Sequence, residues 1–127
     1  MVTLTAEQIV SKLKAAGLPV GRVIVYTDAT DPNKLLGRPG QYTSKADFSD
    51  TRHPELDPTQ TCSGCVEVYP DAAGALARKA YVDRVTQGTP LLLEYTYAEG
   101  NVCLRFDHQF LPSEAAAYDQ ALAALEH

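Results

Sequence analysis

The chain has 127 residues and a formal net charge of −5, with 45% hydrophobic and 21% charged residues. This length predicts one domain with a single core, and the composition is that of an ordinary soluble globular protein. The negative charge argues against nonspecific binding to nucleic acid or to an anionic membrane, because both require clustered Lys and Arg. No apolar run reaches the roughly 18 residues needed to span a bilayer.

We expect a single domain over residues 1–124. Residues 125–127 read Leu-Glu-His, and we interpret them as the remnant of a purification tail. No apolar signal-peptide core follows Met1. Because a chain trimmed at one end can also be trimmed at the other, we do not take this as evidence for a cytoplasmic protein.

The N-terminal segment carries the signature of a helix start. Thr5 is placed as the N-cap, and Gln8 follows three positions later, so the pair predicts a capping box with the helix beginning at about Ala6. Gly17 is typical of the position after a helix. Residues 22–26 are then rich in β-branched side chains, and their continuous hydrophobicity predicts a strand in the centre of a sheet.

Two further strands and a helix are expected next. Residues 42–48 alternate weakly and indicate a strand at a sheet edge, whereas residues 65–69 give a clearer strand. Pro70 opens an alanine-rich segment that predicts a helix running to about Gln87.

The C-terminal third predicts a hairpin and a last helix. Residues 91–97 and 102–106 are the strands, and Gly100 lies in the turn between them, because glycine tolerates positive φ angles. Pro112 marks the first turn of the helix, where Ala, Tyr and Leu recur at core spacing.

The predicted order is helix, strand, strand, strand, helix, strand, strand, helix. Strands joined by a tight turn are antiparallel, so we predict an α+β fold: one mainly antiparallel sheet of about five strands, with three helices packed on one face. Alternation in the later strands predicts one apolar and one polar face. The inward residues would be Val66, Val68, Val102, Leu104 and Phe106, and the polar face would carry Cys65, Glu67, Glu94, Thr96, Cys103 and Arg105.

A long polar segment over residues 28–64 contains most of the candidate chemistry. Loops beyond about a dozen residues are usually functional or disordered. We therefore expect this segment to bind the ligand. The candidate ligand-binding residues are Asp31, Asn33, Lys34, Arg38, Gln41, Tyr42 and Lys45.

Cys62 and Cys65 form a Cys-x-x-Cys motif with three interpretations. A zinc site needs four ligands, and only His53, His108 or Cys103 would remain to complete it. A thioredoxin-like redox site would lie at a helix N-terminus, whereas a strand follows here. The third interpretation is a disulfide, either between Cys62 and Cys65 or between Cys65 and Cys103, and it would indicate an oxidising compartment.

Evidence for calcium binding or catalysis is weaker. Asp28, Asp31 and Asn33 bear a faint likeness to a calcium loop, but Pro32 breaks the EF-hand pattern, so we favour capping of turns. His53 lies among carboxylates that are suited to acid–base catalysis, yet no nucleophile elbow or metalloprotease helix accompanies it.

Residues 35–45 read Leu-Leu-Gly-Arg-Pro-Gly-Gln-Tyr-Thr-Ser-Lys. Together with residues 66–69 and the segment 93–95, they resemble small actinobacterial exported or lipid-anchored proteins of unknown function. The likeness covers most of the chain but does not include the Cys-x-x-Cys motif. It implies an α+β fold and an extracytoplasmic home, secreted or held by an N-terminal lipid anchor in the full-length protein, and it implies no activity.

The leading hypothesis is a non-enzymatic extracytoplasmic domain that binds a protein or cell-envelope ligand through residues 28–64. It needs no cofactor and no nucleic acid. The alternative is a zinc or other metal-binding protein that uses the Cys-x-x-Cys motif, and a small hydrolase-like enzyme is third.

Overall fold

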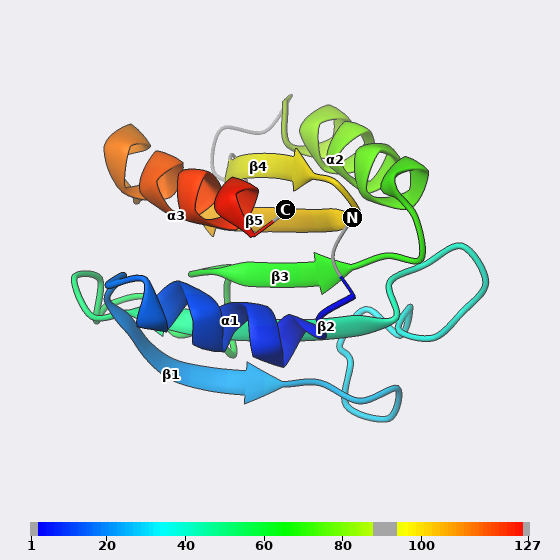
Figure 1. Ribbon diagram of the computed structural model, residues 1–127, viewed down its shortest axis with the longest axis horizontal. Helices are drawn as coiled ribbons and strands as arrows, with labels where there is room; N and C mark the ends of the chain where they lie inside the picture. The colour runs from blue at the N-terminus through cyan, green and yellow to red at the C-terminus, as the bar shows by residue number, and fades with distance from the viewer. Residues whose placement is uncertain (1–2, 88–93, 126–127) are drawn as a thin grey trace.

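The computed structural model describes residues 3–87 and 94–125 (Figure 1). It confirms the predicted α+β fold and the predicted order of elements. The elements are α1 (Ala6–Ala15), β1 (Val20–Val25), β2 (Ser44–Asp50), β3 (Cys65–Val68), α2 (Ala72–Gln87), β4 (Glu94–Glu99), β5 (Val102–Asp107) and α3 (Pro112–Ala124). The predicted start of β4 at residues 91–93 lies outside the described residues.

The five strands form one sheet in the order β1-β2-β3-β5-β4, and every neighbouring pair is antiparallel. Lys45 on β2 lies opposite Glu67 on β3, which in turn lies opposite Cys103 on β5. In the next row Asp47 lies opposite Cys65. Charged side chains from the middle strands therefore stand side by side on one face.

The predicted positions of the first two strands are wrong. β1 lies at the edge of the sheet, where Val23 and Val25 are 41% and 47% exposed. A β-branched run suits an edge strand as well as a central one, so it does not identify the centre. β2 lies inside the sheet although it carries Lys45 and Asp47, because both side chains are buried on the polar face.

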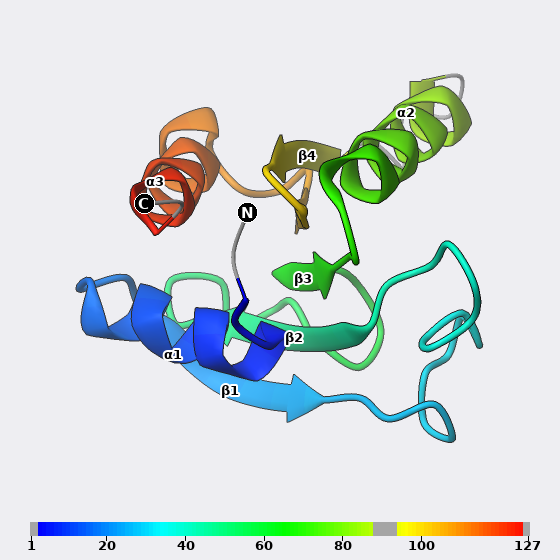
Figure 2. The same ribbon diagram turned by 45° about the vertical axis from the view of Figure 1, so that its right-hand side comes forward.

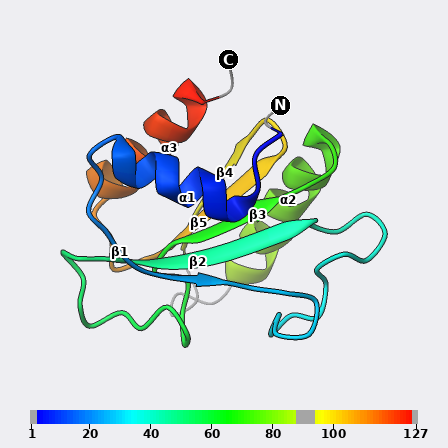
Figure 3. The same ribbon diagram turned by 60° about the horizontal axis from the view of Figure 1, so that its bottom comes forward.

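The helices cover both faces, which corrects the expectation of helices on one face only. α1 and α3 pack on the apolar face, and α2 packs against β4 and β5 on the other (Figure 2). The apolar core contains all five residues predicted to point inward. In Figure 3 the loops that follow β1 and β2 lie below the sheet, away from α1 and α3. The polar face is thus covered by α2 at one side and by loops at the other.

Local signals in the sequence explain the helix start and the hairpin turn. Thr5 and Gln8 form the predicted capping box: the Gln8 N–H donates to Thr5 Oγ1 at 3.2 Å, and the Thr5 N–H donates to Gln8 Oε1 at 2.9 Å. Gly100 has a φ of 56° in the turn between β4 and β5.

Within residues 3–87 and 94–125 no helix combines the length and apolar character that crossing a membrane requires.

Candidate functional site

Glu67 lies at the centre of the polar face and has no exposed surface. Its carboxylate accepts hydrogen bonds from Arg78 Nε on α2 at 3.1 Å and from Arg105 Nη1 on β5 at 3.4 Å. Lys45 Nζ lies 3.9 Å away, and Arg105 also donates to Glu94 at 2.6 Å. A buried charge requires several such partners. This cluster therefore fixes the position of α2 and of the charged side chains on four strands.

Asp31 organises the β1–β2 loop, which we define as residues 26–43. The carboxylate accepts the backbone N–H groups of Asn33 at 3.1 Å, Leu35 at 2.9 Å and Leu36 at 3.0 Å, and the Tyr42 hydroxyl at 2.6 Å. Burial alone would raise the pKa of Asp31, but these four donors lower it below its usual value. One carboxylate thus satisfies three backbone N–H groups of this loop.

Two buried tyrosines anchor the same loop to the sheet. The rings of Tyr42 and Tyr69 meet edge to face with centroids 5.9 Å apart. Ala75 of α2 and Cys103 of β5 complete this small apolar cluster. Burial raises the pKa of both phenols, so they remain uncharged. Tyr42 has no exposed surface and supports the loop from beneath.

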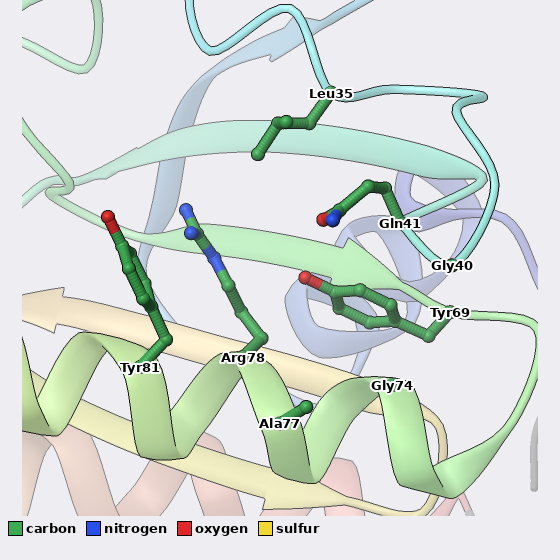
Figure 4. Close-up of a pocket in the computed structure, with 8 residues that line it drawn as sticks. All are labelled: Leu35, Gly40, Gln41, Tyr69, Gly74, Ala77, Arg78 and Tyr81. Atoms are coloured by element: carbon green, nitrogen blue, oxygen red, sulfur yellow. The ribbon is translucent and has the colours of Figure 1, made fainter.

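A groove of about 360 Å³ runs between the β1–β2 loop and α2, and we call it the α2 groove (Figure 4). Figure 4 shows Arg78 and Tyr81 rising from successive turns of α2 toward the loop, with the Gln41 side chain directed into the space between. The lining residues are Leu35, Gly40, Gln41, Tyr69, Gly74, Ala77, Arg78 and Tyr81. The groove therefore depends on the fold of both the loop and the helix.

The exposed wall of the α2 groove is aromatic and cationic. Tyr81 is 49% exposed, and the guanidinium carbons of Arg78 and Arg84 lie 5.6 and 5.8 Å from its ring centroid. Val85, one turn further along the same side of α2, is 47% exposed. Arg78 is held in place by Glu67. Tyr and Arg side chains beside exposed apolar surface are typical of protein-binding surfaces.

A second, smaller recess of about 230 Å³ lies on the polar face near Lys45, and we call it the Asp47 recess. Its lining residues are Tyr26, Pro32, Asn33, Lys45, Asp47, Pro58, Thr59, Gln60, Thr61, Cys62 and Arg105. The rim includes the disulfide between Cys62 and Cys65, which is one of the two predicted pairings. Cys103 is a free, buried thiol, and burial raises its pKa to about 12. The alternative Cys65–Cys103 pairing is therefore wrong.

The structure separates the seven predicted ligand-binding residues, of which six lie on the β1–β2 loop and Lys45 lies on β2. Gln41 lines the α2 groove, whereas Asn33 and Lys45 line the Asp47 recess. Lys34 and Arg38 line a third, open depression on the outer part of the loop. The remaining two, Asp31 and Tyr42, are buried supports of the loop.

The candidate ligand-binding residues predicted from the sequence do not include those of α2 that line the groove. Arg78, Tyr81 and Val85 follow one another at spacings of three and four, so the helical period places them on one side of the helix. This spacing of a cationic, an aromatic and an apolar residue is the signal in the sequence, and the structure shows that Tyr81 and Val85 are exposed.

The residues predicted as metal ligands do not lie together around one possible metal position. Among residues 3–87 and 94–125, no group of three or more His, Cys, Asp or Glu is placed to hold a metal ion. Cys62 and Cys65 are joined in the disulfide, so they do not present the thiolates that zinc binds. His108 is exposed and lies 3.5 Å from Asp107.

His53 links the loop after β2 to α3. Its Nε2 lies 2.8 Å from Glu114 and its Nδ1 lies 3.2 Å from Glu55, while its ring stacks on Phe110 with centroids 4.4 Å apart. Burial alone would lower the pKa of His53, but the two carboxylates raise it above its usual value. Both ring nitrogens are engaged by carboxylates, so this histidine holds two segments together and presents no unengaged nitrogen to a substrate.

No family model matches the chain, and comparison with curated proteins and with solved structures gave no match. The case for a function therefore rests on the two recesses of the polar face and on the side chains that line them.

Proposed function

We propose that this protein is a non-enzymatic extracytoplasmic binding domain whose α2 groove takes up part of a protein partner. The observation that carries the proposal is the groove itself, in which Arg78 and Tyr81 face Gln41 across an open space of about 360 Å³. The cell-envelope ligand considered from the sequence is the alternative occupant of the same surface.

The rigidity of both walls supports this proposal. Asp31 holds the backbone of the loop, and the buried Glu67 holds Arg78, so neither wall must be ordered when a partner binds. Preorganised side chains avoid part of the entropic cost of association. Tyr and Arg contribute more than most residue types to binding free energy at protein interfaces.

The extracytoplasmic location is part of the proposal. Its support is the Cys62–Cys65 disulfide, because disulfides persist in oxidising compartments and are rare in the cytosol. The resemblance to exported or lipid-anchored actinobacterial proteins agrees with this location, and an N-terminal lipid anchor would place the groove at the cell surface.

A double variant tests the function without disturbing the core. Tyr81→Ser with Gln41→Ala removes one side chain from each wall, and Leu76→Ser is the matched control because Leu76 is 59% exposed on the opposite side of α2. Envelope proteins captured by each variant are quantified by mass spectrometry. We expect one partner to be retained by the control and reduced about thirtyfold by the double variant, which corresponds to the loss of about 2 kcal/mol. Capture of the same proteins by all three forms would contradict the proposal.

A further inference from the structure

The Asp47 recess contains two polar groups whose hydrogen-bonding capacity the described residues do not satisfy. Asp47 is 5% exposed, and its Oδ1 is fully buried without a hydrogen-bond partner among residues 3–87 and 94–125. Lys45 is 3% exposed, and its Nζ lies 3.8 Å from Asp31 and 3.9 Å from Glu67, beyond hydrogen-bonding distance. Such groups are uncommon in folded proteins because each one costs free energy. Asp47, a hydrogen-bond acceptor, and Lys45, a donor, thus both line this recess with part of their hydrogen-bonding capacity unused.

The surrounding charges argue against a strongly charged ligand. In the cluster around Glu67, the cations Lys45, Arg78 and Arg105 are matched by the anions Asp31, Glu67 and Glu94. Asp47 is the additional carboxyl group, and burial raises its pKa to about 6 despite the neighbouring Lys45 and the Tyr26 hydroxyl. Lys45 would repel a cation, while Glu67 would repel an anion. A cation that approached Asp47 would be repelled by Lys45 and Arg105, which also line the recess, and an anion that approached these two would be repelled by Asp47. The desolvation cost of a charged ligand would therefore be only partly offset.

A hydroxyl group has the properties that this recess requires, because it donates to a carboxylate and accepts from an ammonium group at the same time. The rim adds further groups of the same kind, including the amide of Asn33 and the side chain of Gln60. The Tyr26 ring also lines the recess, and Lys45 Nζ lies 5.4 Å from its centroid. At about 230 Å³ the recess is smaller than the roughly 300–1,000 Å³ of drug-sized sites, so it suits a single small ring.

We infer that the Asp47 recess is a binding site for a neutral polyhydroxylated ligand, namely a sugar ring that donates a hydroxyl to Asp47 and accepts from Lys45. This site is distinct from the α2 groove, since the two share no lining residue. A test of sugar binding is therefore independent of whether the α2 groove binds a protein partner.

Saturation-transfer NMR with the intact protein tests this inference. The neutral probes are glucose, galactose, mannose, arabinose and N-acetylglucosamine. Methylammonium and acetate serve as the charged probes. We expect at least one sugar to bind with a Kd below about 10 mM, in the weak range for a site of this size, and more tightly than either charged probe. Failure of every sugar to bind, which is the result expected if the recess holds only water, would overturn the inference. So would tighter binding of either charged probe.

Two variants place the binding in this recess. Asp47→Leu removes the carboxyl group and keeps a side chain of similar size, although Lys45 and the Tyr26 hydroxyl lose a neighbouring carboxylate. We expect it to weaken sugar binding at least tenfold, and Asp47→Asn serves as a second variant if the first fails to fold. Tyr81→Ser in the α2 groove should leave sugar binding unchanged. Equal binding by the Asp47 variants and the unmodified protein would overturn the assignment.

Discussion

Replacing Asp31 with Asn removes the negative charge on which the β1–β2 loop depends. Asp31 Oδ2 accepts three donors, the N–H groups of Leu35 and Leu36 and the Tyr42 hydroxyl, whereas Oδ1 accepts the Asn33 N–H. The least costly orientation of the new amide places its nitrogen at the Oδ1 position. One hydrogen bond is then lost, and three others lose the assistance of the charge.

The magnitude follows from these contacts. Hydrogen bonds to a charged group each contribute about 1.5–3 kcal/mol, and removing one partner of a buried charged pair costs about 3–5 kcal/mol. Lys45 Nζ, at 3.8 Å from Asp31, also loses its nearest carboxylate. We therefore expect the free energy of unfolding to fall by about 3 kcal/mol. For a domain of this length that is a decrease in Tm of about 10 °C.

Urea unfolding monitored by circular dichroism measures this loss, and Asp28→Asn is the matched control because Asp28 is an exposed residue of the same loop. The control should change the free energy of unfolding by no more than about 0.5 kcal/mol. The pKa of Asp31 is lowered in the folded state, so its contribution is present above the unfolded value near 3.9 and is lost as the pH falls through the folded value. A loss below about 1 kcal/mol, or one equal to that of the control, would refute the reasoning.

Three further predictions concern His53, the Cys62–Cys65 disulfide and Cys103. The carboxylates beside His53, Glu114 foremost, outweigh burial and raise its pKa, so its stabilisation is full below about pH 6.5 and fades as the pH rises through the folded value. Urea titrations should show the protein losing stability relative to His53→Gln above that pH, and parallel pH profiles would contradict this. Intact mass should show two hydrogens fewer than the fully reduced chain, and reducing the Cys62–Cys65 bond should cost about 2 kcal/mol because the closed loop is short. Cys103 should react with a thiol reagent only after unfolding, since it is buried and its pKa is raised to about 12; rapid labelling of the folded protein would contradict its placement.

The sequence was most informative where local chemistry determines structure. The capping box at Thr5 and Gln8, the turn at Gly100 and the alternation in β3 and β5 depend on neighbouring residues, and the structure contains all three. Strand order was less accessible. The hydrophobic run in β1 does not distinguish a central strand from an edge strand, and Lys45 and Asp47 in β2 made a buried strand resemble an exposed one.

The lining of the two recesses was only partly predictable for a related reason. Gln41 and Asn33 were predicted to bind a ligand because they lie in a long polar loop, and the structure places them in the lining of the two recesses. Arg78 and Tyr81 were not, because their significance depends on α2 packing against the polar face rather than the apolar one. That choice of face is determined by long-range partners such as Glu67, which no local pattern in the sequence identifies.

The central claim, that the α2 groove binds a protein partner, is tested most directly by photo-crosslinking. A photoreactive phenylalanine derivative is placed at Tyr81 in one protein and at Leu76 in another, since both positions are exposed on α2 but only the first lines the groove. Each protein is irradiated in the cell envelope of the organism that makes it. The account predicts one discrete crosslinked protein from position 81 and none from position 76. Identical crosslinks from both positions, or none from position 81, would contradict it.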